Sequence, residues 1–243
     1  MAKVDEILVD EDEMQADIQD KSRQLRVAAR ALSRAGLVHA FGHCSIRIDE
    51  SSFIVSPAKP LGNIRAGEAG VIVPIDGGLP EGVLGEVRLH QAIYRKREDV
   101  KAICRITPRQ VELLSLIRRT PQVRNGLSVF FDPCPPFWND PRLLREDLAA
   151  ARLAEQLGSA RAIVMRANGA VVVGVDLAEA VAMSWLLEEA ARVELGLMQI
   201  SRDGEDALLT SDEIKARLET SGHVGRRIWE FLTSSDEEAV SMR

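Results

Sequence analysis

The sequence predicts a single α/β domain built on a mainly antiparallel sheet. Its 243 residues, 46% of them hydrophobic and 28% charged, suit one domain that buries a substantial core. Short apolar runs alternate with segments of helical periodicity, and Asn168-Gly169 separates two apolar runs as a hairpin turn does. No internal repeat or linker divides the chain. These observations favour one sheet covered by helices.

The N-terminal third is expected to hold a helix and three strands. Residues 1–13 are acidic and are expected to form a flexible arm. Residues 14–35 predict a helix because apolar residues recur three and four apart, and Gly36 suits its C-terminal cap. The strands are expected over residues 44–48, 52–56 and 70–75.

The remaining segments alternate between helix and strand around a proline-rich loop at 120–142. A strand is expected over 100–107, where Arg105 lies by parity on the same side as Ile103. In the last long helix, Glu188 and Arg192 are expected to pair one turn apart. The helices are expected over residues 85–97, 108–118, 143–157, 176–199 and 211–218.

Composition argues against several classes of function. The net charge of −6 gives no general affinity for nucleic acid, and no apolar run approaches the roughly 20 residues of a membrane span. The acidic N-terminus lacks a signal-peptide core. Cys44, Cys104 and Cys134 have no metal-type spacing and are expected to be buried thiols. We therefore expect a cytoplasmic protein that binds a small molecule but neither nucleic acid nor membrane.

Two short motifs carry candidate chemistry. Glu86 and His90 lie one helical turn apart, and a carboxylate beside an imidazole can perform acid–base work. Periodicity alone favours the alternative, a carboxylate at a helix N-terminus and a half-buried histidine. In Gly42-His43-Cys44-Ser45 the glycine would let a ligand approach the backbone, and free N–H groups suit anions. The alternative there is a tight helix-to-strand turn.

Five motifs in this order resemble the class II aldolase/adducin family over about residues 20–235. They are R-A-G-L-V-H-A-F-G-H-C-S-I-R, F-I-V-S-P-A, G-E-V-R-L-H-Q-A-I-Y-R-K-R-E-D-V-K-A-I, M-R-A-N-G-A-V-V-V-G and L-A-E-A-V-A-M-S-W-L-L-E-E-A-A. The resemblance implies a single α/β/α domain over 14–233 with a flexible tail at 234–243. It also implies a homo-oligomer, with a tetramer favoured, in which Trp138, Trp229 and Phe231 could serve contacts or form a satellite core.

The resemblance also implies a site whose metal ligands have been replaced. Family members usually bind a divalent metal through three histidines, and the matching positions here hold Arg105, Thr107 and Asn168. Arginine would repel a metal, so no metal or other cofactor is expected. By resemblance, Glu86 would be the catalytic acid/base, with Arg105 supplying positive charge. The substrate-binding residues would be Gly42, His43, Ser45, His90, Thr107, Asn168 and Gly169.

Three hypotheses about function remain open at this point. The first is a metal-independent carbon–carbon lyase, of aldolase or decarboxylase type, for a small carboxylate- or phosphate-bearing substrate. The second is a catalytically inactive protein that keeps the fold for binding or structural roles, as adducins do. The third is a metal enzyme with displaced ligands, namely His43, Glu86 and His90.

Overall fold

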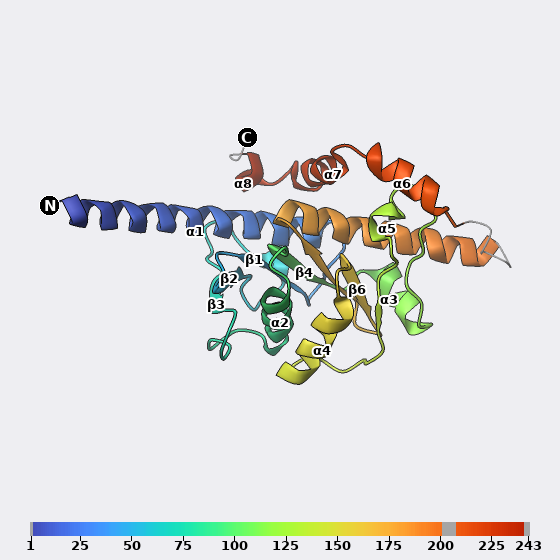
Figure 1. The fold of residues 1–243 in the computed structure, drawn as a ribbon, viewed down its shortest axis with the longest axis horizontal. Coiled ribbons are helices and arrows are strands. Elements are labelled where there is room, and N and C mark those ends of the chain that lie inside the picture. Colours follow the sequence, from blue (N-terminus) through green and yellow to red (C-terminus); the bar gives the residue numbers. More distant parts are fainter. Residues whose placement is uncertain (1, 201–207, 241–243) are drawn as a thin grey trace.

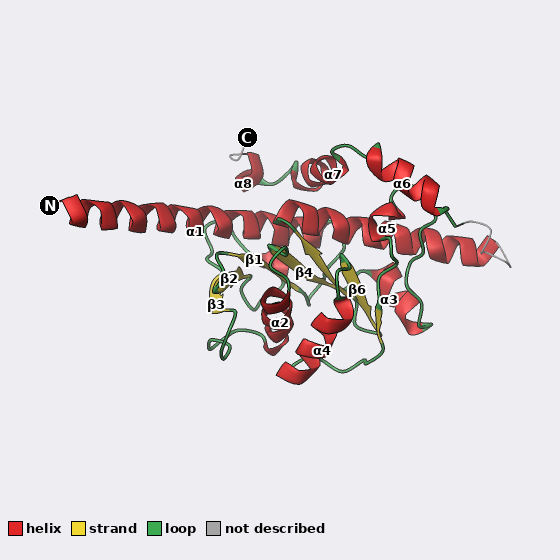
Figure 2. Ribbon diagram, in the orientation of Figure 1, coloured by secondary structure: helices red, strands yellow, loops and turns green. Residues whose placement is uncertain are grey.

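A mixed sheet in the strand order β3-β2-β1-β4-β7-β6-β5 organises the chain (Figures 1 and 2). The computed structural model describes residues 2–200 and 208–240. All neighbouring strands are antiparallel except β5 and β6, so the predicted, mainly antiparallel sheet is confirmed. The strands are β1 (His43–Arg47), β2 (Ser52–Val55), β3 (Val71–Pro74), β4 (Ala102–Ile106), β5 (Phe137–Trp138), β6 (Ala162–Met165) and β7 (Ala170–Gly174).

Helices cover both faces of the sheet. In Figure 1, α1 and α5 run along one face, α2 and α4 lie on the other, and α6 to α8 stack outside α1 and α5. Across the described ranges, no helix is long and apolar enough to cross a bilayer. The helices are α1 (Ala2–Arg34), α2 (Arg88–Lys96), α3 (Arg109–Leu116), α4 (Asp147–Leu157), α5 (Leu177–Ile200), α6 (Ser211–Glu219), α7 (Val224–Thr233) and α8 (Glu237–Val240).

Strand alternation divides the interior into two cores. Cys44 and Cys104 face the first core, which also contains residues of α1, α3 and α5. Ile103 and Val171 face the second core with residues of α2 and α4. Burial raises the pKa of the Cys104 thiol to about 12, whereas Cys134 is only half-buried. The expectation of buried thiols is therefore confirmed for two of the three cysteines.

The same alternation decides which polar side chains meet. His43 lies opposite Arg105 in the β1–β4 register, and Ser45 lies opposite Ile103. Because alternate side chains of a strand point to one face, His43, Ser45 and Arg105 all face the α2 side with Ile103. Strand alternation therefore places these three polar side chains in an otherwise apolar layer beneath α2.

Both chain ends differ from the sequence expectation. Helix α1 begins at Ala2, so the segment expected to be a flexible arm is helical. The expected flexible tail also contains α8, and its acidic side chains bind the arginines of α1: Asp236 pairs with Arg30 at 2.7 Å. Residues 241–243 of that tail lie outside the described residues.

Glu188 does not form the helical pair that its spacing suggested. Its carboxylate accepts hydrogen bonds from the backbone N–H groups of Gln110 and Val111, at 3.0 to 3.1 Å, and so caps the N-terminus of α3. Arg192 instead lies 3.4 Å from Glu189. Glu188 is on the buried side of α5, where the free N–H groups of a helix end attract a carboxylate more strongly than an exposed arginine can.

The C-terminal ion pairs should make stability depend on acid pH. Burial alone would raise the pKa of Asp236, but hydrogen bonds from Arg30 and Arg34 outweigh burial and hold that pKa below the usual 3.8. A lowered folded-state pKa stabilises the fold above the unfolded-state value, and this stabilisation is lost as pH falls through the folded-state pKa. Asp236→Asn should therefore make the free energy of unfolding fall less steeply as the pH is lowered into the acid range. Identical acid limbs in urea titrations of the two proteins would contradict this.

Candidate functional site

Arg105 lies in β4, near the middle of the sheet, and only 3% of its surface is exposed. Its Nη1 donates to the Ile106 carbonyl oxygen at 2.8 Å, and its Nη2 donates to Asn168 Oδ1 at 2.7 Å. Nη2 also lies 3.8 Å from Glu86 Oε1. Burial lowers the pKa of the guanidinium, and the charge of Glu86 opposes that shift. Arg105 is thus a buried cation between an amide and a carboxylate.

The β6–β7 hairpin brings Asn168 to Arg105. The Met165 N–H donates to the Gly169 carbonyl at 2.8 Å, which closes the predicted hairpin turn. Gly169 has a φ of +69° and lies so close to the end of β4 that a Cβ there would overlap the Ile106 carbonyl oxygen. Thr107 is the next residue after β4, and its Cα would be 2.8 Å from that Cβ. The three positions that resemble the family's metal ligands therefore do come together.

The loop before β1 approaches β4 from the other side. Gly42 has a φ of +133°, and a Cβ there would meet Val38 and, at 3.0 Å, the Arg105 carbonyl oxygen. Only glycine tolerates this approach, so Gly42 serves the close contact between the loop and β4. His43 follows directly and is buried beside Arg105.

Four side chains, from His43 to Tyr94, form a linear chain of hydrogen bonds, which we call the file. Tyr94 is the only tyrosine in the sequence. His43 Nδ1 lies 2.8 Å from His90 Nε2, and His90 Nδ1 lies 2.6 Å from Ser45 Oγ. Ser45 Oγ in turn lies 2.8 Å from the Tyr94 hydroxyl. Burial, with the charge of Arg105 as a smaller cause, lowers the pKa of His90 to about 3. Burial likewise lowers the pKa of His43, so both imidazoles are neutral.

Sequence reasoning missed Tyr94 as a member of this site. The signal was its spacing, because Glu86, His90 and Tyr94 follow one another at intervals of four residues. Glu86 lies in the 3₁₀ turn Gly85–Val87 that leads into α2, with 18% of its side chain exposed. The turn and α2 therefore place all three side chains over the sheet.

Buried polar atoms without a hydrogen-bond partner are concentrated here. The described residues contain six such side-chain atoms, and four belong to this site: His43 Nε2, Glu86 Oε1, Arg105 Nε and Asn168 Nδ2. Buried polar groups in folded proteins are nearly always hydrogen-bonded, so such a group of unsatisfied atoms marks a place for ordered water or a polar ligand. Arg105 Nε and Asn168 Nδ2 can only donate, which suits an anion.

The side chains of this site do not fit the divalent metal that the family resemblance implies. Arg105 offers donors and no lone pair, and Asn168 Oδ1 already accepts a hydrogen bond from it. The alternative set of His43, Glu86 and His90 is no better, since both ring nitrogens of His90 have hydrogen-bond partners. Within residues 2–200 and 208–240, no three His, Cys, Asp or Glu side chains are grouped as metal ligands.

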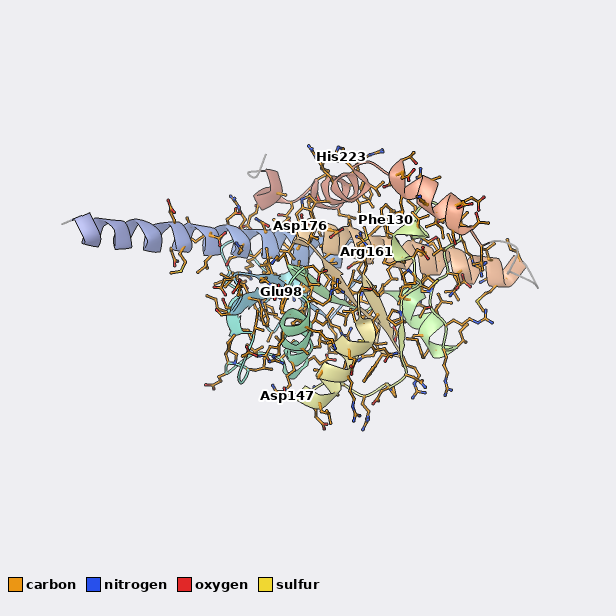
Figure 3. All side chains as sticks on the ribbon, in the orientation of Figure 1. Glu98, Phe130, Asp147, Arg161, Asp176 and His223 are labelled. Atoms are coloured by element: carbon orange, nitrogen blue, oxygen red, sulfur yellow. The ribbon has the colours of Figure 1, made fainter. Side chains whose placement is uncertain are left out.

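The remaining histidines and the aromatic residues of interest lie elsewhere. His39 is exposed, and His223 is exposed at the start of α7, on the C-terminal helices at the upper edge of Figure 3. Trp138 and Trp229 pack partly buried against the two cores, as a satellite core would. Phe231 is 69% exposed, so it stays free for contacts with another molecule.

Solved structures with this fold are numerous. An L-fuculose 1-phosphate aldolase from Glaciozyma antarctica PI12 superposes with a TM-score of 0.75 at 20% identity, over 94% of this chain and 93% of that one. An aldolase II superfamily protein from Pseudomonas syringae gives 0.77 at 19% identity, over 93% and 94%. YgbL from Escherichia coli, a candidate aldolase, epimerase or decarboxylase, gives 0.69 at 22% identity, over 82% and 97%.

The family-level comparison is more specific than these superpositions, which show the fold alone. No curated protein sequence matches the chain. The family model described as "Class II Aldolase and Adducin N-terminal domain" matches residues 23–195, which span β1 to β7 and every residue of the site. The chain therefore belongs to the class II aldolase/adducin family.

Proposed function

We propose that this protein is a carbon–carbon lyase for a small carboxylate- or phosphate-bearing substrate, and that Arg105 supplies the positive charge that a metal supplies elsewhere in the family. One observation carries the proposal: a buried guanidinium and a neighbouring amide both retain unused donors, Arg105 Nε and Asn168 Nδ2. By family resemblance we extend the proposal to a cytoplasmic homotetramer.

Anion binding follows from the donors and from their surroundings. Charge-assisted hydrogen bonds from arginine to a carboxylate or phosphate are about twice as strong as neutral ones. Arg105 is almost fully buried, so little water competes for its Nε. The similar structures include L-fuculose 1-phosphate aldolases, whose substrate carries a phosphate by name. An anionic substrate of this chain would be held by the unused donors of Arg105 and Asn168.

Carbon–carbon cleavage is accelerated by a positive charge that stabilises the released electron pair and by an acid–base group that transfers the proton. When the bond breaks, its electron pair moves onto carbon and is delocalised onto an adjacent oxygen, where a fixed positive charge stabilises it. Arg105 would hold that oxygen. Glu86 Oε1 is buried and unpartnered, 3.8 Å from Arg105 Nη2, so Glu86 would exchange a proton with the reacting carbon.

The second candidate is an inactive protein on the aldolase scaffold, and one observation favours it. Asn168 and Glu86 already surround Arg105, so the three side chains partly satisfy one another without a ligand. A protein that had lost its reaction would keep such an arrangement only for packing. The two candidates differ in what happens when Glu86 loses its charge.

Glu86→Gln is expected to abolish turnover of any substrate that the wild-type protein converts. The amide keeps the size of the side chain but cannot take up or release the proton, and lost general acid–base catalysis costs typically 10²–10⁴-fold, so we expect a fall of about 10²-fold or more in kcat. Wild type and variant would be assayed for product formation from a panel of hydroxy acids, keto acids and sugar phosphates.

Glu81→Gln is the matched control, because Glu81 is exposed in the preceding loop and its loss removes the same charge. It should retain wild-type turnover. The lyase proposal fails if the wild type neither binds nor converts any compound of the panel, or if Glu86→Gln is as active as the wild type. The first of these outcomes supports the inactive scaffold protein.

A further inference from the structure

The file of hydrogen bonds beneath α2 has a direction that can be worked out by counting protons. Neutral His43, His90, Ser45 and Tyr94 carry one exchangeable side-chain proton each. Three bonds link the four groups, and each bond needs one of these protons. One proton is left over. Ser45 could keep it only by accepting from both neighbours, and its hydroxyl would then be a buried donor without an acceptor among the described residues. The spare proton therefore lies at one of the two ends of the file.

The two ends are chemically different. At one end the Tyr94 hydroxyl lies 3.5 Å from the Lys101 carbonyl oxygen, which can only accept a hydrogen bond. At the other end His43 Nε2 is buried and has no partner within the described residues. Placing the fourth proton on Tyr94, toward Lys101, makes a fourth hydrogen bond. Placing it on His43 Nε2 leaves a buried donor unsatisfied, which costs free energy.

We propose that Tyr94, Ser45 and His90 are positioning residues that hold His43 in the tautomer with its proton on Nδ1. Tyr94 then donates to Lys101, Ser45 to Tyr94, His90 to Ser45 and His43 to His90. His43 Nε2 is left as a bare lone pair beside Arg105. The substrate group that meets it must be a hydrogen-bond donor, so the substrate is an anion that also carries a donor such as a hydroxyl group.

This inference rests on the proposed function for its substrate class, but its structural part stands on the hydrogen bonds alone. Charge supports it too, because burial and the nearby Arg105 lower the pKa of both imidazoles and keep them neutral. With one ring proton each, their tautomers are set by their partners, as in other histidines whose second nitrogen is hydrogen-bonded. In this arrangement Arg105 and Asn168 donate hydrogen bonds to the substrate, and His43 accepts one from it.

Nitrogen-15 NMR of the ligand-free protein tests the inference directly, because protonated and bare ring nitrogens resonate far apart. The measurement would use His39→Gln/His223→Gln, which removes the two exposed histidines and leaves the file intact. His43 and His90 are both expected to carry their proton on Nδ1. A proton on Nε2 of His43, or an even mixture of the two tautomers, would overturn the proposal.

Tyr94→Phe removes only the hydroxyl at the end of the file. Without it the spare proton loses its acceptor at Lys101, so the share of His43 protonated on Nε2 should rise severalfold. Ser45→Ala interrupts the file one step earlier and should have the same effect if Tyr94→Phe folds poorly. Unchanged tautomers in a folded variant would refute a positioning role for these side chains.

Phe53→Leu is the control for packing. The Phe53 ring lies 6.3 Å from the His90 ring and 4.9 Å from the Tyr94 ring, yet it takes part in none of the hydrogen bonds. This variant should keep the wild-type tautomers, and an equal shift would show that packing sets them. Since NMR needs no substrate, the tautomer can be refuted while the lyase stands, and the lyase assay can fail while the tautomer is confirmed.

Discussion

Arg105→Met is expected to abolish binding and turnover of the substrate and to lower the stability of the protein. The buried guanidinium costs desolvation free energy, which its lowered pKa reflects, and only Asn168, Ile106 and the more distant Glu86 compensate it. Methionine removes that cost but leaves Glu86 Oε1 and Asn168 Oδ1 without their partner, and breaking a buried pair in this way costs about 3–5 kcal/mol. The loss of a fixed stabilising donor costs catalysis about 10²–10³-fold.

Urea unfolding and the substrate panel measure the two effects on the same variant. Arg152→Met is the control, because Arg152 is exposed on α4 and its replacement should leave both stability and turnover near wild type. Loss of both stability and turnover is the expected result, because Arg105 holds Asn168 and Glu86 as well as the substrate. A gain in stability with loss of turnover would contradict the role in holding these two side chains and would mark Arg105 as a residue kept for function alone.

Gly169→Ala is expected to destabilise the protein by about 3 kcal/mol or more. A residue with a side chain pays roughly 1–2 kcal/mol in the left-handed conformation that Gly169 adopts at φ +69°. The added Cβ would also overlap the Ile106 carbonyl oxygen and crowd Thr107, and overpacking costs typically about 1–3 kcal/mol more. The turn that presents Asn168 to Arg105 would have to move.

Gly36→Ala separates these two costs. Gly36 also has a φ of +69°, but a Cβ there would have nothing within 4 Å. It should therefore lose only the conformational part, about 1–2 kcal/mol. Equal losses in free energy of unfolding for the two variants, measured with urea, would mean that the hairpin accommodates the methyl group and that its approach to β4 is not tight.

Much of the site could be predicted because local pattern governs it. Strand alternation alone placed Arg105 on the same side as Ile103, and the structure confirms that side as the one facing α2. The spacing of Glu86 and His90 predicted that they share a face, and the structure places Glu86 in the turn before α2 and His90 within α2. Asn168-Gly169 predicted the hairpin turn. Each of these inferences needs only neighbours within about four residues.

What could not be predicted depends on distant partners. Glu188 caps a helix some 78 residues away in sequence, and no local signal distinguishes this from a pair with Arg192. The role of Tyr94, on α2, depends on Ser45, which is 49 residues away on β1. The acidic C-terminus looked like a solvated tail because the arginines that bind it belong to the first helix.

That C-terminal contact has a consequence for how the protein is made. Arg30 leaves the ribosome early, whereas Asp236 is synthesised 206 residues later. At bacterial or eukaryotic rates of about 5–20 residues per second, roughly 10–40 s pass between the two. Throughout that interval the nascent first helix lacks the carboxylates that neutralise its arginines. Only chains synthesised past Asp236 can close this contact, so it forms later than the contacts within the sheet.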